Sequence, residues 1–311
     1  MDNLCHTLVG AALAQSGLKK RTGLGAATLM IGANFPDIDV IAVPLGRATE
    51  FRRGWTHGIL ALVVLPFVLT MLMIAWDRYR RRPDDVDRAP VVQRELLLLS
   101  TISILTHPTL DWMNSYGMRW LMPLSGRWFY GDSLFIVDPW LLVILGLGVW
   151  LSRRRERNDK PYAPHPARVA VGIAAIYIAS MLGLQEIAAR SARGELAGSA
   201  KAREALFVVA SPADPLRWRV YADDGDRYWR GTLSLTQREG SRLVFAEDFI
   251  MKNAGDPAAI AASNTERGRK FLDWARMPSY RIDRRSSPTR VQIVDARYGA
   301  NVEIVLDAPA P

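Results

Sequence analysis

The sequence predicts an all-α polytopic membrane helical bundle over residues 1–190, followed by a small extracytoplasmic α+β domain over residues 191–311. Two observations carry this prediction. Up to about residue 188, apolar stretches alternate with short Arg-rich loops, and from about residue 190 the chain is mixed, charged and rich in turns. The mean hydropathy of +0.01 averages over both parts, so it hides the apolar half.

Four apolar segments are candidates for crossing a bilayer. The clearest is 59–76, which contains no charged residue and approaches the roughly 20 residues that cross a hydrocarbon core. The other three are 96–113, which His107 and Asp111 interrupt, 134–151 and 169–184.

The first 35 residues are expected to form a hairpin of two short apolar arms, 8–18 and 24–33, joined by Lys19-Lys20-Arg21. Each arm is too short to span a bilayer alone, so the hairpin should pack inside the bundle or enter the membrane partway. Several Gly and Ala residues in the two arms favour close helix contact in lipid.

The C-terminal domain is predicted from short strand-like runs with turns between them, such as Asp223-Asp224-Gly225. A helix is expected over 257–276. The predicted strands are 205–209, 216–221, 228–235, 243–246, 291–294 and 302–306.

The basic residues predict an orientation. The loops at 19–21, 77–95 and 152–168 hold 15 Lys and Arg, whereas those at 34–58 and 112–133 hold 5. By the positive-inside rule the first set is cytoplasmic, which gathers the candidate ligands at the opposite face and leaves the C-terminal domain outside the bacterial inner membrane. We expect no cleavable signal peptide, because the amino end lacks a basic n-region and Lys19 breaks its apolar run.

The net charge of +9 comes largely from these loops. It therefore indicates topology and attraction to a lipid surface. A nucleic-acid partner is not expected, because no patch of basic and aromatic residues accompanies the charge.

The sharpest local motif is His107-Pro-Thr-Leu-Asp111. On a helix, residues i and i+4 share one face, so the imidazole and the carboxylate can hold one ion. Pro108 favours a helix that begins or kinks nearby. The alternative is a His–Asp hydrogen bond that closes a helix end.

A second motif, Asp37-Ile38-Asp39, follows Asn34-Phe35-Pro36. On its own it fits a polar turn at a membrane exit. Because apolar residues surround it and His57 follows in Trp55-Thr56-His57, a metal site is the stronger interpretation. In an extended stretch both acids would point the same way, so one could bridge ions while the other binds or orients a histidine.

Other polar residues at the same predicted face are weaker candidates. His6 is a lone histidine near a terminus, and only the shared face favours a role for it. Asp132 and Asp138 flank the third long segment, where either could accept a hydrogen bond, bind an ion or cap a helix. Arg53 and its neighbour Arg52 are expected to be interfacial anchors, although a cation beside a metal can also hold a phosphate.

The order of several motifs resembles the bacterial inner-membrane metal-dependent hydrolase family with the YdjM-like domain, over roughly residues 1–190. The motifs are an N-terminal His, Phe-Pro-Asp-Ile-Asp, Arg-Arg-Gly-Trp-Thr-His, Thr-His-Pro-Thr-Leu-Asp and Gly-Asp-Ser-Leu-Phe-Ile-Val-Asp-Pro. That family is in turn similar to the zinc-dependent phospholipase C and single-strand nuclease superfamily. The second His-x-x-x-Glu pair of those enzymes is missing here, so the resemblance implies one or two zinc ions rather than three. The ligands it implies are His6, Asp39, His57, His107 and Asp111.

The resemblance implies a membrane-bound, zinc-dependent hydrolase. The expected site at the bilayer interface suits a phosphoester of a lipid or lipid-linked substrate at the outer face. Asp37 or Asp132 is the expected base, with Asp138 and Arg53 as further ligands or supporting residues. The alternative is a non-enzymatic protein, either a metal-stabilised membrane scaffold or an ion carrier.

Overall fold

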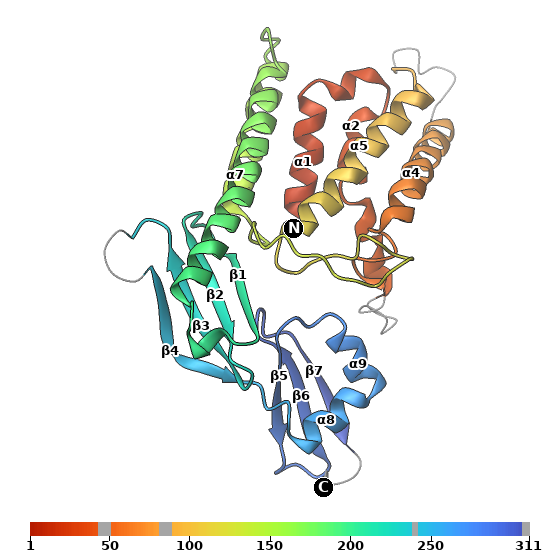
Figure 1. The fold of residues 1–311 in the computed structure, drawn as a ribbon. Helices are drawn as coiled ribbons and strands as arrows, with labels where there is room; N and C mark the ends of the chain where they lie inside the picture. Colours follow the sequence, from red (N-terminus) through yellow and green to blue (C-terminus); the bar gives the residue numbers. More distant parts are fainter. Residues whose placement is uncertain (43–50, 81–88, 238–241, 307–311) are drawn as a thin grey trace. The chain divides into compact units, whose positions relative to one another are not determined.

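A computed structural model describes residues 1–42, 51–80, 89–237 and 242–306 (Figure 1). The chain divides into two compact units. The first comprises Met1–Gln185 together with Ala210–Pro215, and the second comprises Glu186–Val209 together with Leu216–Pro311.

The first unit begins with two helices packed closely against each other, α1 (Asn3–Gln15) and α2 (Gly25–Gly32). Asp2 caps α1 by accepting a hydrogen bond from the Cys5 amide at 3.0 Å. A Cβ at Gly10 would lie 2.4 Å from the carbonyl oxygen of Leu29, so only glycine permits this approach. A short 3₁₀ helix, η1 (Leu18–Arg21), joins the pair.

Four longer helices complete this unit: α4 (Ile59–Arg80), α5 (Gln93–Trp112), α6 (Pro139–Arg157) and α7 (His165–Glu195), which continues into the second unit. Helix α5 packs against α2 and α4, and α6 packs against α1. A buried apolar cluster from α4 and α5 forms part of the core: Leu69, Met73, Leu96 and Ile104.

Among the described helices, only α4 and α7 are long and apolar enough to cross a membrane, judged by length and composition alone. The predicted polytopic bundle is therefore wrong. The predicted segments 59–76 and 169–184 lie in these two helices. Segment 96–113 lies in α5, whose charged residues lower its hydropathy, and 134–151 lies only partly in α6, which starts at Pro139 and runs into an Arg-rich end.

The second unit contains two β-sheets and two short α-helices, in agreement with the predicted α+β class. The first sheet has the order β1-β2-β3-β4, with β2 paired to β3 and β3 to β4 in antiparallel register. The second has the order β5-β6-β7. The strands are β1 (Ala205–Ala210), β2 (Arg217–Asp223), β3 (Arg227–Ser234), β4 (Leu243–Met251), β5 (Pro278–Asp283), β6 (Thr289–Asp295) and β7 (Asn301–Leu306).

The helix expected over 257–276 is two helices, α8 (Pro257–Asn264) and α9 (Glu266–Leu272). Thr265 divides them because its backbone is extended and its side chain caps α9 by accepting from the Gly268 amide at 3.0 Å. Strand β5 was not predicted. Both helices pack against the second sheet.

Candidate metal centre

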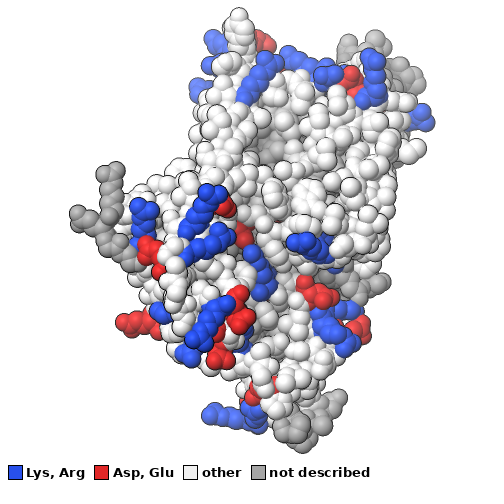
Figure 2. All heavy atoms as spheres, in the orientation of Figure 1, with Lys and Arg blue, Asp and Glu red and all other residues white. Residues whose placement is uncertain are grey.

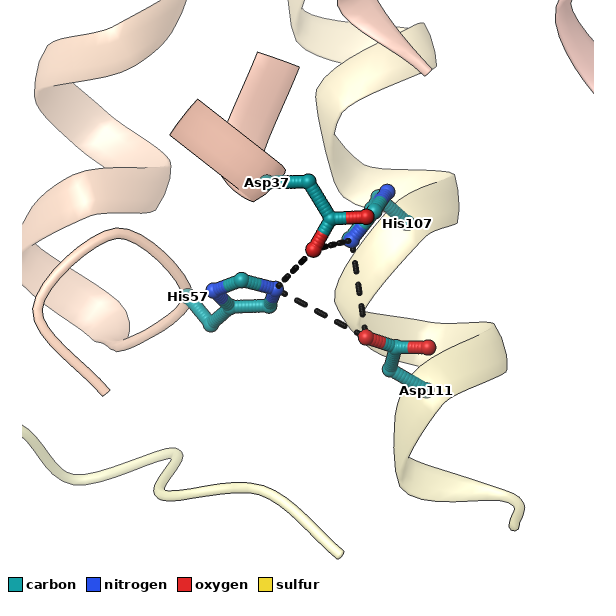
Figure 3. Close-up of side chains that lie close together, drawn as sticks. All are labelled: Asp37, His57, His107 and Asp111. Atoms are coloured by element: carbon teal, nitrogen blue, oxygen red, sulfur yellow. Dashed lines mark ion pairs between the residues drawn. The ribbon is translucent and has the colours of Figure 1, made fainter. Parts of the chain in front are cut away.

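Four side chains from three separate segments of the first unit converge on one buried point (Figure 3). Each offers one ligand atom, and these atoms all lie within 4.8 Å of one another. The group consists of Asp37 on the 3₁₀ helix η2 (Phe35–Ala42), His57 in the turn before α4, and His107 and Asp111 on α5.

Helix α5 continues through Pro108, so His107 and Asp111 keep their i, i+4 alignment. Their Nε2 and Oδ2 atoms are 3.5 Å apart. The Nδ1 atom of His107 lies 2.7 Å from the carbonyl oxygen of Ala33, which can only accept, so Nδ1 carries the proton. Nε2 is thereby directed into the group as a potential ligand.

The two neighbouring acids, Asp37 and Asp39, point in different directions because their segment is a 3₁₀ helix, whereas an extended stretch would align them. Oδ1 of Asp37 is 3.7 Å from Nε2 of His57 and 3.5 Å from Nε2 of His107. Oδ2 of Asp39 lies 3.6 Å from the other nitrogen of His57, Nδ1. It also accepts a hydrogen bond from the Arg53 amide at 2.8 Å. Asp37 therefore faces the group. Asp39 lies behind His57, and the Thr56 hydroxyl connects the two, since it is 2.9 Å from Nδ1 of His57 and donates to Oδ2 of Asp39 at 3.3 Å.

The spacing of the four ligand atoms suits a single small divalent ion. Four edges of the group, each from a histidine Nε2 to a carboxylate oxygen, measure 3.5–3.7 Å. A tetrahedral ion with ligands at about 2.0–2.2 Å has edges of about 3.3–3.6 Å. Among the described residues, Nε2 of His57, Nε2 of His107 and Oδ2 of Asp111 are buried without a hydrogen-bond partner. Because buried polar atoms are nearly always paired, these three atoms fit a bound cation.

The charges around the group keep its carboxylates ionised. Burial acts to raise the pKa of Asp37, but the charge of a protonated His107 outweighs it and lowers that pKa to about 2. Burial lowers the pKa of His57, which favours the neutral imidazole that a metal ion requires. At His107 burial also acts to lower the pKa, but the carboxylates of Asp111 and Asp37 outweigh it and raise that pKa to about 9, so a metal ion must displace a proton there. The guanidinium of Arg53 lies 3.1 Å from Oδ1 of Asp111 and compensates its buried charge.

His6 lies beside the group but outside its four members. Its ring stacks on that of His107 with centroids 3.8 Å apart, and its Nε2 is 3.4 Å from Oδ1 of Asp111. Both ring nitrogens are buried without a hydrogen-bond partner among the described residues. The amino group of Met1 forms a buried ion pair with the same carboxylate.

Arg53 is buried within the site and does not sit at an exposed interface. Besides Asp111, its guanidinium bonds to Oδ1 of Asn114 at 3.3 Å and lies 4.4 Å from the ring centre of Tyr116. The predicted role as an interfacial anchor therefore fits only its exposed neighbour Arg52.

The other two predicted acids lie outside the group of four. Asp138 is the N-cap of α6, where it accepts from the amides of Trp140 and Leu141 at 3.1 Å, and it also accepts from the Tyr177 hydroxyl at 2.9 Å. Asp132 is buried with a left-handed backbone (φ 52°), and its carbonyl accepts from the Ala210 amide at 3.0 Å.

Three supporting groups were not found from the sequence: the Ala33 carbonyl, the Thr56 hydroxyl, which lies 2.9 Å from Nδ1 of His57, and the Asn114 side chain. Thr56 and Asn114 could have been suspected from their proximity to His57 and Asp111. Nothing in the sequence marks Ala33, because every residue carries a carbonyl.

Two helices that are long and apolar enough to cross a membrane, together with a buried His–Asp group, point to a membrane protein with a candidate metal centre. The chain belongs to the YdjM inner membrane protein family, whose model matches residues 1–191. It is therefore an inner membrane protein. The searches of curated proteins and of solved structures gave no match.

Proposed function

We propose that this inner membrane protein is a metal-dependent hydrolase that cleaves a phosphoester of a lipid or lipid-linked substrate. The observation that carries the proposal is the group of three buried, unpartnered atoms on His57, His107 and Asp111, which a divalent ion would complete. Zinc is the expected ion, because two imidazoles and carboxylates in near-tetrahedral spacing suit it.

In this proposal His57, His107 and Asp111 would hold the ion. His6 lies beside them, but Oδ1 of Asp111, the oxygen nearest to it, is already paired with the Met1 amino group and with Arg53. A bound divalent ion supplies Lewis-acid activation of water and of a phosphoryl oxygen. The Thr56 hydroxyl and the Ala33 carbonyl fix the two imidazole rings through their Nδ1 atoms, and Arg53 fixes the carboxylate of Asp111. Asp39 acts behind Thr56, from which it accepts a hydrogen bond.

Asp37 is the proposed base. Its side chain is 21% exposed, whereas those of His57, His107 and Asp111 are at most 1% exposed, so water and substrate reach Asp37 first. Asp132, the second acid predicted for this role, serves as the comparison in the test.

The proposed orientation places the centre at the outer face. The basic turns, which are the described parts of the Lys- and Arg-rich loops at 19–21 and 152–168, lie at the other end of the first unit. There Lys19 pairs with Glu156, and the Arg168 guanidinium donates to the Ser16 carbonyl at 2.7 Å. Figure 2 shows Lys and Arg side chains gathered at that end, above a broad face without charge. The positive-inside rule makes that end cytoplasmic, with α7 leading outward to an extracytoplasmic C-terminal domain.

The experiment is a comparison of Asp37→Asn with wild type for bound zinc and for hydrolysis of phosphatidic acid and phosphatidylglycerol in mixed micelles. A base that is dispensable for metal binding predicts unchanged zinc content and at least a hundredfold lower rate. Asp132→Asn should retain more activity than Asp37→Asn. Wild-type, zinc-loaded protein that cleaves neither lipid would contradict the proposal.

One observation favours the alternative of a metal-stabilised scaffold. Asp37 is itself one of the four residues whose ligand atoms converge, so it could be a fourth ligand of the ion. Four protein ligands close a structural zinc site, whereas a catalytic site keeps one position for water. Loss of both zinc and thermal stability in Asp37→Asn would support the scaffold.

A further inference from the structure

An apolar groove of about 580 Å³ lies in the first unit between α1, α5, α6 and α7. Its size is within the range of small-molecule sites. Among the described residues that line it, none is charged, and the polar ones are Thr106 and Thr109.

Both threonines are already satisfied within their own helix. The Thr106 hydroxyl donates to the Ser103 carbonyl at 2.7 Å, and the Thr109 hydroxyl donates to the Leu105 carbonyl at 2.8 Å. They therefore present their methyl groups, and the groove favours an occupant without hydrogen-bonding groups.

Small side chains on α7 create the space. Ala174, Ala175, Ile178 and Ala179 line the groove at helical spacing, so one face of this candidate spanning helix forms a wall. A helix at this position in an inner membrane protein meets lipid chains, which supply an apolar occupant at the right depth.

The groove and the candidate metal centre share two helices. On α1, His6, Val9 and Leu13 follow the i, i+3, i+7 spacing of one face, so this face leads from the centre into the groove. On α5, Leu110 lines the groove and Asp111, the next residue, belongs to the centre.

We infer that this groove binds one hydrocarbon chain of the membrane lipid whose phosphate group lies at the metal centre. The uncharged groove suits a neutral chain, and the centre with a divalent ion suits an anionic head. The position of the head rests on the proposed function, whereas the binding of the chain rests on the groove alone.

The test uses full-length protein in vesicles of phosphatidylethanolamine and phosphatidylglycerol that contain a phosphatidylglycerol with a diazirine at the end of one acyl chain. After irradiation, mass spectrometry should find labelled peptides from the groove faces of α1, α5 and α7. Ala179→Phe fills the groove and should reduce this labelling at least fivefold. Ser180→Phe adds similar bulk at an exposed neighbour on α7 that does not line the groove, and should leave labelling unchanged.

Equal labelling of the groove in wild type and Ala179→Phe would overturn the inference, as would labelling confined to the exposed face of α4. Hydrolysis is measured separately on the same proteins. Groove labelling without lipid hydrolysis would support the groove and contradict the proposed function. Lipid hydrolysis without groove labelling would support the proposed function and contradict the binding of a chain in the groove.

Discussion

Asp37 and Asp39 contact opposite nitrogens of the same imidazole. Oδ1 of Asp37 is 3.7 Å from Nε2 of His57, and Oδ2 of Asp39 is 3.6 Å from its Nδ1. Asp37 thus faces the candidate centre, whereas Asp39 lies behind the ring and reaches it through the Thr56 hydroxyl. Substitutions of Asp37 and of Asp39 should therefore have different effects on metal binding and on activity.

Asp39→Asn should weaken zinc binding by about 10–100-fold without abolishing it, because it removes the charge behind a ligand rather than the ligand. A competition titration against a chelator measures the change. Asp226→Asn, at an exposed acid of the second unit, is the control and should not alter affinity. Unchanged affinity in Asp39→Asn would exclude a positioning role for Asp39.

Arg53→Met should destabilise the metal-free protein by about 1.5–3 kcal/mol, because the buried carboxylate of Asp111 loses a charged hydrogen bond and keeps only the Met1 amino group as a fixed positive partner. Thermal unfolding in detergent measures this loss. Arg52→Met changes the adjacent, exposed arginine and should cost less than about 1 kcal/mol. Equal effects of the two substitutions would argue against the compensating role.

Gly10→Ala should destabilise the protein by about 1–3 kcal/mol, because its Cβ would clash with the Leu29 backbone and separate α1 from α2. Gly146→Ala in α6 is the matched control, since nothing lies within 4 Å of its added Cβ. There the higher helix propensity of Ala should stabilise by up to about 1 kcal/mol. Denaturation of both variants in the same detergent gives the comparison.

The proposed orientation predicts that a periplasm-specific reporter fused after Pro311 is active, and that the same reporter inserted at Asp159, between α6 and α7, is inactive. The physical reason is the concentration of Lys and Arg in the basic turns. Activity at Asp159 and none after Pro311 would invert the orientation and place the centre at the cytoplasmic face.

The sequence was most informative where spacing alone determines geometry. The proximity of His107 and Asp111 could be predicted because residues i and i+4 share a face of any continuous helix. Helix α4 could be predicted because its sequence is an uninterrupted apolar run. The directions of Asp37 and Asp39 could not be predicted, because they depend on whether the eight residues Phe35–Ala42 form a 3₁₀ helix or an extended stretch. The spanning potential of α5 and α6 was overestimated because apolar runs were counted without the charged ends of the same helices.

Strand β5 could not be predicted from its own sequence. Its sequence, Pro278–Asp283, mixes charged and apolar residues over a short run, and pairing with β6 rather than local propensity defines it. The sequence marks Asp138 as a candidate but does not decide between a helix cap and a metal ligand, because an aspartate suits both roles.

Zinc content, measured by elemental analysis of detergent-purified wild type, His107→Ala and His165→Ala, tests the central claim most directly. His165 lies at the start of α7, outside the candidate centre. We predict that wild type and His165→Ala bind the same amount of zinc, at least one equivalent. We predict that His107→Ala loses about one equivalent, because the ligands of one ion act as a unit. Full occupancy in His107→Ala, or wild-type protein that binds no zinc, would contradict the account and leave the His–Asp group as a buried structural network.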